Sequence, residues 1–146
     1  MYSQYDKGMA FVMQITLIVT LVLHTLAGVF WAGSTFALAR TAGASADRLF
    51  GPQMGAALVA ILSGGYLWHL LHPSGVGRPE QVLAIGALCA ILAAGVQALL
   101  CGPALRRRAG TTANDERSQS RVVLGERIAA LLLTLTIICM AAARYL

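Results

Sequence analysis

Residues 11–39 read FVMQITLIVTLVLHTLAGVFWAGSTFALA, an apolar run without one Asp, Glu, Lys or Arg. A helix of ~20 mostly apolar residues crosses the ~30 Å hydrocarbon core of a bilayer. Three further apolar runs follow at residues 52–72, 82–101 and 122–143. Helices are expected throughout, because a backbone exposed to lipid must satisfy its own hydrogen bonds. The sequence predicts an all-α integral membrane four-helix bundle, with residues 1–146 forming one transmembrane domain.

The overall composition supports a membrane protein. Of the 146 residues, 58% are hydrophobic and only 12% are charged, about half the charged share of an average soluble domain, ~25%. The net charge of +5 comes from residues that flank the apolar runs. We therefore expect these charges to contact anionic lipid headgroups, and we expect no binding to nucleic acid.

The distribution of basic residues predicts the orientation of the chain. The segments after the first and third apolar runs carry eight arginines, which are Arg40, Arg48, Arg106, Arg107, Arg108, Arg117, Arg121 and Arg127. The other side carries Lys7, Arg78 and Arg144. By the positive-inside rule, the arginine-rich side is cytoplasmic and both termini are non-cytoplasmic. The expected location is the bacterial inner membrane, as a multi-pass protein.

Each predicted helix has one face that differs from a plain lipid-facing surface of Leu, Ile and Val. Residues three, four and seven positions apart share a helical face. The four faces are Met13, Thr20, His24, Gly28, Trp31 and Thr35; Leu58, Leu62, Gly65, His69 and His72; Gly86, Ala90, Ala93, Ala94 and Gln97; and Glu126, Ala130, Leu133, Ile137, Met140 and Arg144. We expect these faces to turn inward together.

Three histidines lie in or at the ends of the spans, and the predicted orientation puts all three in the outer half of the membrane. His24 is the deepest, and His69 and His72 lie at the outer end of the second helix. A neutral imidazole in lipid still needs a hydrogen-bond partner. Thr20 or Gln97 would supply one if His24 is structural. Otherwise an ionisable or metal-binding side chain inside the membrane indicates a functional site.

The motif formed by His24 and "WAG" at residues 31–33 resembles the first helix of the CopD-like membrane proteins. The same pattern occurs in the small HemJ-type protoporphyrinogen oxidases. The final segment, LLLTLTIICMAAARYL at residues 131–146, is also similar to the last helix of short CopD-like proteins. The resemblance implies a four-helix bundle that binds a b-type haem or copper, with His24 as a ligand. HemJ-type enzymes use an intramembrane lysine, and because the only lysine here is Lys7, we expect no protoporphyrinogen oxidase activity.

Haem b is the expected cofactor, because a haem needs axial histidines, an apolar slot and cations near its propionates. His24 and His69 are the expected axial pair, with His72 in reserve. Gly28 and Gly65 would let the porphyrin approach, and Trp31 shares the His24 face. Arg144 and Arg78 would lie near the propionates. The expected function is redox or electron transfer in the outer half of the membrane, with a quinone or a periplasmic redox partner.

Two alternatives remain open. In the first, Met13, His69, His72 and Met140 form a copper-capture site that leads to His24, since imidazole and thioether both suit copper. In the second, the chain is an accessory subunit of a larger membrane complex, or a homo-oligomer, with its small-residue faces against partner helices.

The remaining polar and sulfur-containing residues give weaker signals. Cys89, Cys101 and Cys139 are dispersed and predict no disulfide. Glu126, near the cytoplasmic end of the last helix, is expected to pair with Arg121 or Arg127. The sequence contains no hydrolytic or phosphoryl-transfer motif.

Overall fold

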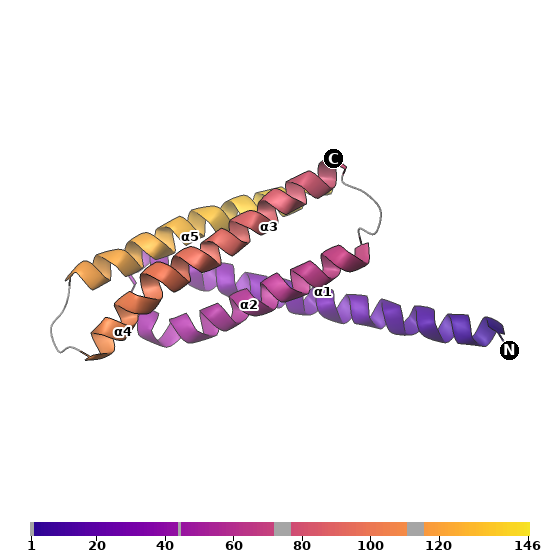
Figure 1. Ribbon diagram of the computed structural model, residues 1–146, viewed down its shortest axis with the longest axis horizontal. Coiled ribbons are helices and arrows are strands. Elements are labelled where there is room, and N and C mark those ends of the chain that lie inside the picture. The colour runs from indigo at the N-terminus through magenta and orange to yellow at the C-terminus, as the bar shows by residue number, and fades with distance from the viewer. Residues whose placement is uncertain (1, 44, 72–76, 111–115) are drawn as a thin grey trace.

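The computed structural model describes residues 2–43, 45–71, 77–110 and 116–146, and the side chains of all of these except 2–7 and 107–110. The described residues form helices α1 (Tyr2–Arg40), α2 (Ala46–Leu71) and α3 (Arg78–Val96), the π-helix η1 (Gln97–Cys101), and helices α4 (Gly102–Gly110) and α5 (Glu116–Ala143). They contain no strand. Helices α3, η1 and α4 follow one another as a single rod (Figure 1).

Four helical stretches are long and apolar enough to span a membrane, at Gly8–Arg40, Ala46–Leu71, Arg78–Arg106 and Glu116–Ala143. The predicted all-α four-helix membrane bundle is therefore confirmed. The first stretch has 33 residues and is about 50 Å long at ~1.5 Å per residue. It exceeds the ~30 Å hydrocarbon core, and the N-terminal part of α1 projects past the other helices (Figure 1).

The π-helix has a sequence cause in Pro103. Proline has no N–H to donate to the carbonyl four residues earlier, and its ring crowds that carbonyl. The chain widens by one residue just before Pro103, and the Gly102 N–H bonds to the carbonyl of Gln97. Such π-bulges occur frequently at functional sites.

The bundle is built from two helical hairpins, α1 with α2 and α3 to α4 with α5, which lie against each other (Figure 1). Small side chains allow close packing between helices in lipid. The main core cluster consists of Trp31, Ala57, Ala60, Ala90, Ala93, Ala129 and Leu133. A second cluster consists of Leu38, Ala46, Cys101, Ala104 and Val122. It lies at the end of the bundle where Arg40, Arg48, Arg106 and Arg121 are found, which we call the arginine end.

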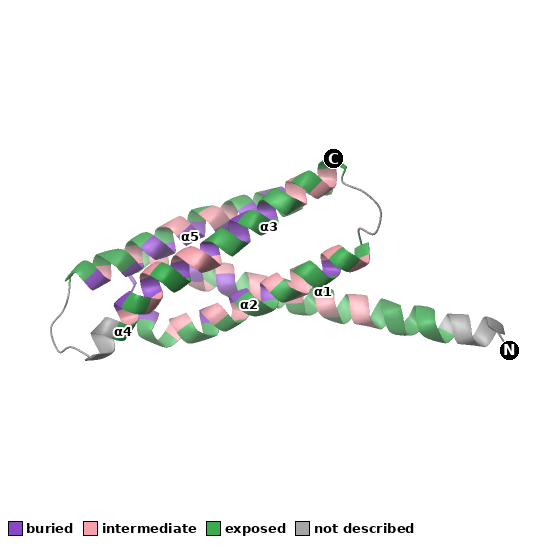
Figure 2. Cartoon of the chain, in the orientation of Figure 1, coloured by how far each residue is buried: buried purple, intermediate pink, exposed green. Residues whose placement is uncertain are grey.

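Burial along α1 is concentrated toward the arginine end. The described residues of α1 before Trp31 are all exposed or half-buried, whereas Trp31, Thr35 and Leu38 are buried. Figure 2 shows the same contrast along α1. Helix α1 is thus better packed in the part nearest the arginine end.

The structure confirms the inward face of α3 and corrects two others. Gly86, Ala90 and Ala93 of α3 and Gln97 of η1 are buried as predicted, and Ala94 is half-buried. The predicted face of α2, including Leu58, Leu62, Gly65 and His69, is exposed. The buried positions of α2 are Ala46, Gln53, Ala57, Ala60 and Leu67. On α5, Glu126, Ala130 and Leu133 are buried, but Ile137 and Met140 are exposed, as is Arg144 just after the helix.

Candidate functional site

Six buried side chains from all four spans meet inside the bundle and form what we call the polar centre. They are Trp31 and Thr35 of α1, Gln53 of α2, Gln97 and Cys101 of η1, and Glu126 of α5. Thr35, Gln53, Gln97 and Cys101 are 0% exposed and Glu126 is 1% exposed. A carboxyl group at this position inside a membrane bundle is costly, and such groups mark functional sites.

Two glutamine amides hold one oxygen of the Glu126 carboxyl group. Glu126 Oε2 accepts from Gln53 Nε2 at 3.1 Å and from Gln97 Nε2 at 3.0 Å. The same two nitrogens also donate to Thr35 Oγ1, at 2.8 Å and 3.0 Å. Each amide nitrogen has two hydrogens, so both amides donate to their full capacity.

The other members of the polar centre complete this network. Trp31 Nε1 donates to Gln97 Oε1 at 2.8 Å, and the Thr35 hydroxyl donates to the Trp31 carbonyl at 2.8 Å. The Cys101 thiol lies 3.6 Å from Glu126 Oε1 and 3.7 Å from the Val122 carbonyl, a weak donor shared between two acceptors. Every nitrogen-bound hydrogen and the hydroxyl of the centre are therefore engaged.

One acceptor in this network has no donor. Among the described side chains, Gln53 Oε1 is the buried nitrogen or oxygen atom that lacks a hydrogen-bond partner. Leaving a buried polar group without a partner costs roughly 1–3 kcal/mol. The polar centre therefore lacks one hydrogen-bond donor. The acceptor that lacks it is the oxygen of the same carboxamide whose nitrogen donates to Glu126.

Glu126 makes no ion pair within the described part of the chain. Its described partners are two amides and a thiol, all uncharged. The predicted pairing with Arg121 or Arg127 is wrong, because both arginines are exposed on α5 while Glu126 points inward. A carboxylate here carries a buried negative charge that no described cation neutralises.

The π-helix brings two residues to Glu126 from one short segment. Gln97 and Cys101 are the first and last residues of η1, and both contact the Glu126 carboxyl group. Gly125 makes room for this approach, because a Cβ at that position would be 2.8 Å from Cys101 Sγ and 3.2 Å from Leu100 Cβ.

His24 lies outside the polar centre and contacts α2. Its Nδ1 lies 2.9 Å from the Ala60 carbonyl and 3.2 Å from Ser63 Oγ. The ring also contacts the backbone at Gly64, where a Cβ would be 3.0 Å from His24 Cε1. The predicted structural partners Thr20 and Gln97 are wrong, because Thr20 bonds to the Thr16 carbonyl and Gln97 belongs to the polar centre.

His24 and the polar centre are separate sites at different depths. Along α1, His24 precedes Trp31 by seven residues, and along α2 its partner Ala60 follows Gln53 by seven residues. Both counts give about 10 Å at ~1.5 Å per residue. The two sites therefore have independent environments.

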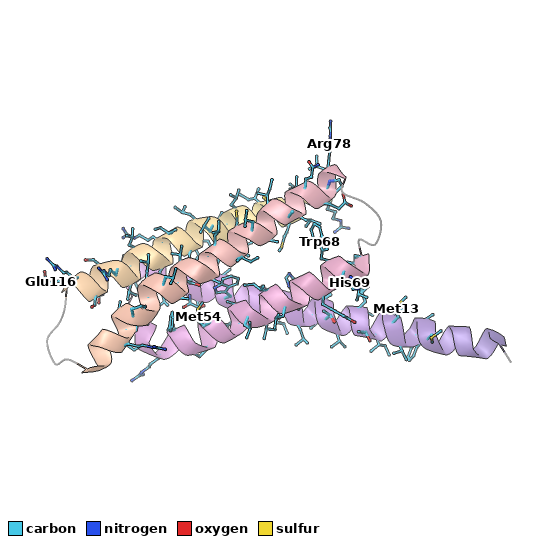
Figure 3. The ribbon with its side chains drawn as sticks, viewed as in Figure 1. Met13, Met54, Trp68, His69, Arg78 and Glu116 are labelled. Carbon is cyan, nitrogen blue, oxygen red and sulfur yellow. The ribbon has the colours of Figure 1, made fainter. Side chains whose placement is uncertain are left out.

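The other predicted site residues do not gather around His24. His69, Gly65, Arg78, Arg144, Met13 and Met140 are exposed, and Gly28 is half-buried with open space where a Cβ would lie. Figure 3 shows Met13, His69 and Arg78 at the end of the bundle opposite Glu116. His72 lies outside the described residues. Trp31 belongs to the polar centre, and Gly64 rather than Gly65 contacts the His24 ring.

His69 lies farther along α2 than Gly64, the glycine that contacts the His24 ring. His69 follows Gly64 by five residues, which is about 7.5 Å along the helix at ~1.5 Å per residue. The described residues contain no group of three or more His, Cys, Asp and Glu side chains that could hold a metal ion. The pairing of His24 with His69 stays a prediction.

Trp31 is the one member of the polar centre among the predicted site residues. Thr35, Gln97 and Glu126 are predicted only to lie on inward faces, and Gln53 and Cys101 are on none of the predicted faces. Gln53 was the clearest available signal, because it is an amide in an apolar span and shares a three-to-four-residue spacing with Ala57, Ala60 and Gly64. Cys101 gave no comparable signal, since a buried cysteine is an ordinary small apolar residue.

Comparison with known proteins adds no neighbour to this description. No family model, curated protein or solved structure matches the chain. The resemblance to CopD-like proteins therefore stays a prediction.

Proposed function

We propose that the protein is a membrane redox protein that binds a b-type haem through His24. The observation that carries this proposal is the hydrogen bond between His24 Nδ1 and the Ala60 carbonyl, 2.9 Å long. A carbonyl only accepts, so Nδ1 carries the hydrogen of the neutral imidazole and Nε2 keeps its lone pair. Nε2 has no hydrogen-bond partner in the described part of the chain.

This arrangement suits an axial ligand. Histidines that bind a metal usually donate their other ring N–H to a carbonyl or carboxylate, which fixes the ring and raises its basicity. The Ala60 carbonyl takes that role, and the absence of a side chain at Gly64 gives the ring its position against α2. A haem bound at Nε2 would supply one-electron chemistry.

The surroundings of His24 also agree with a porphyrin ligand. Exposed apolar side chains flank it on α1. Arg78 is exposed at the end of the bundle away from the arginine end (Figure 3), and Arg144 is exposed close to the C-terminus. These cations are suited to propionate groups. Trp31 belongs to the polar centre and has no role in this proposal. His69 is the candidate for the sixth ligand of the haem iron. A quinone or a periplasmic protein is the proposed electron partner.

An absorption spectrum of the purified full chain, oxidised and then reduced, tests the proposal. We expect a Soret band in the wild-type protein, and loss of most of it in His24→Ala. His69→Ala tests the sixth ligand, since it should change the spin state without removing the haem.

Two glycines of α2 provide a matched control. Gly64→Leu should lower haem content, because its side chain would collide with the His24 ring, whereas Gly55→Leu meets open space nearer the arginine end and should leave haem content unchanged. Absence of haem from the wild-type protein, or an unchanged spectrum in His24→Ala, would overturn the proposal. Metal analysis then separates copper binding from a protein without a cofactor.

We also propose that the chain lacks protoporphyrinogen oxidase activity, because its one lysine, Lys7, precedes the first apolar run. The chain should fail to restore growth in a strain that lacks protoporphyrinogen oxidase. Restoration by this chain alone would show that the enzyme chemistry does not require an intramembrane lysine.

The charge distribution underlies a proposal about orientation and location. We place the arginine end in the cytoplasm of a bacterial inner membrane and both termini outside. A cysteine introduced as Thr112→Cys, which lies outside the described residues, should react with an impermeant maleimide only after the membrane is opened. Labelling of this position in intact cells would show that the orientation is opposite to the one proposed.

A further inference from the structure

We propose that the polar centre is a proton-binding site, in which Glu126 takes up and releases one proton and Gln53 Oε1 accepts the hydrogen of the protonated carboxyl group. This site is separate from His24 and does not depend on haem binding. Three observations support it.

The first observation is the uncompensated charge of Glu126. The groups that face it are Gln53 from α2, Gln97 and Cys101 from η1, and Thr35 of α1 through both amides. None is a cation, and Cys101 is the one other titratable side chain in contact with it among the described residues. The nearest charged residues on its own helix, Arg121 and Arg127, are exposed. A buried charge without a partner is strongly unfavourable, and a proton on the carboxylate removes it.

The second observation is the missing donor. Gln53 Oε1 is buried without a partner, and Gln53 Nε2 on the same carboxamide already contacts Glu126 Oε2 at 3.1 Å. A protonated carboxyl group has one O–H to donate. Turning the Gln53 amide over brings its oxygen to face Glu126 in place of the nitrogen, at the cost of the two hydrogen bonds that Gln53 Nε2 donates to Glu126 Oε2 and Thr35 Oγ1. Both of those oxygens keep a hydrogen bond from Gln97 Nε2. One proton therefore removes the charge and gives Gln53 Oε1 a donor.

The third observation decides between a proton and a metal cation. Hard cations such as Ca²⁺ and Mg²⁺ take about six or more oxygen ligands. Thr35 Oγ1 and Gln97 Oε1 already accept hydrogen bonds, as does Glu126 Oε2. Among the side-chain oxygens of the polar centre, Gln53 Oε1, Glu126 Oε1, which has a weak thiol donor, and the second lone pair of Gln97 Oε1 remain available. Three oxygens are too few to replace a hydration shell, whereas a proton needs one oxygen to hold it and one to accept from it.

Proton uptake would act on the contact between the two hairpins. Gln53 lies on the first hairpin and Glu126 on the second, and their hydrogen bond joins the two. Glu126 follows Arg121 by five residues, which is about 7.5 Å at ~1.5 Å per residue. The site is therefore closest to the aqueous phase at the arginine end, which we take as the side of proton exchange.

Infrared difference spectra of the full chain in phosphatidylcholine vesicles, recorded between acidic and alkaline samples, test the proposal. The wild-type protein should show a C=O stretching band of a protonated carboxyl group, at the frequency of a carboxyl group that is not in contact with water. Glu126→Gln should remove this band. Glu116→Gln, an exposed glutamate on the same helix, should retain it. Gln53→Met should keep the band but move it to higher frequency, because the protonated carboxyl group loses its acceptor.

A second measurement keeps the proposal falsifiable if a variant folds poorly. The unfolding midpoint of the wild-type protein should change with pH over the range of the infrared titration, and that of Gln53→Met should change over a different range. A band that persists in Glu126→Gln, or a wild-type spectrum without a band, overturns the proposal. At constant pH, a wild-type midpoint that rises when NaCl replaces choline chloride, with no rise in Glu126→Gln, would identify a metal-cation site and also overturn it.

Discussion

Replacement of Gln97 by leucine tests whether the polar centre stabilises the bundle. Gln97 makes three interhelical hydrogen bonds, to Trp31 Nε1 at 2.8 Å, Thr35 Oγ1 at 3.0 Å and Glu126 Oε2 at 3.0 Å. Leucine makes none of them. Thr35 and Glu126 keep their bonds to Gln53, but the indole N–H of Trp31 loses its acceptor.

The expected loss follows from these three bonds. Interhelical hydrogen bonds in a membrane protein contribute ~0.6 kcal/mol each on average, so three give about 2 kcal/mol. If the bond from Trp31 is instead counted as a buried N–H left without an acceptor, at ~1–3 kcal/mol, its sum with ~1.2 kcal/mol for the other two bonds is about 2–4 kcal/mol. We therefore expect Gln97→Leu to lower the free energy of unfolding by about 2–4 kcal/mol.

Reversible unfolding by sodium dodecyl sulfate in mixed micelles measures this loss. Fluorescence in a Trp68→Phe background reports on Trp31 alone, since the chain has two tryptophans. Gln81→Leu is the control, because Gln81 is an exposed glutamine on α3 and its replacement should change stability by less than ~0.5 kcal/mol. If Gln97→Leu is as stable as Gln81→Leu, the network does not stabilise the fold and the reasoning is refuted.

Two further substitutions test the packing of α5. Gly125→Ala should destabilise the bundle by ~1–3 kcal/mol, because the new methyl group would be 2.8 Å from Cys101 Sγ, whereas Gly95→Ala meets open space and should be neutral or stabilising. Equal unfolding free energies for these two variants would contradict the close approach of η1 to α5. Thr136→Val should cost ~0.6–1.7 kcal/mol, because the hydroxyl shares its hydrogen between the Leu132 carbonyl of α5 and the Gly86 carbonyl of α3, both at 3.0 Å, and the second is an interhelical bond. Thr134→Val, whose hydroxyl bonds within α5, should cost less, and the reverse order would show that the interhelical bond is not the stabilising contact.

Hydropathy and helical spacing predict the four spans and some of the inward positions. A polar side chain among small residues predicts an inward face, as Thr35, Gln97 and Glu126 illustrate. The inward face of α2 is predicted wrongly because the prediction follows the stripe that contains His69 and His72 and not the stripe that contains Gln53. That stripe also contains Leu58 and Leu62, which lipid accommodates as well as protein does.

The contacts among the inward residues depend on details that the sequence pattern does not contain. On α5 the predicted stripe and the buried positions both repeat every seven residues, but the buried set of Val122, Ala129, Thr136 and Ala143 is displaced by one position from Ala130, Ile137 and Arg144. Such a repeat belongs to helices that coil around a neighbour. The meeting of Gln53 with Glu126 depends on the relative height of two hairpins, which helical periodicity leaves undetermined.

The hydrogen bonds of the polar centre bear on how the chain enters a membrane. Gln53 pairs with Thr35 inside the first hairpin, and Glu126 pairs with Gln97 inside the second. An isolated helix would carry such a polar residue into lipid without an interhelical partner, at a cost of several kcal/mol for an unsatisfied group. A hairpin inserted as a pair brings a partner with it. We expect biogenesis to proceed two helices at a time, with the bonds from Trp31 to Gln97 and from Gln53 to Glu126 forming only when the two preassembled hairpins associate.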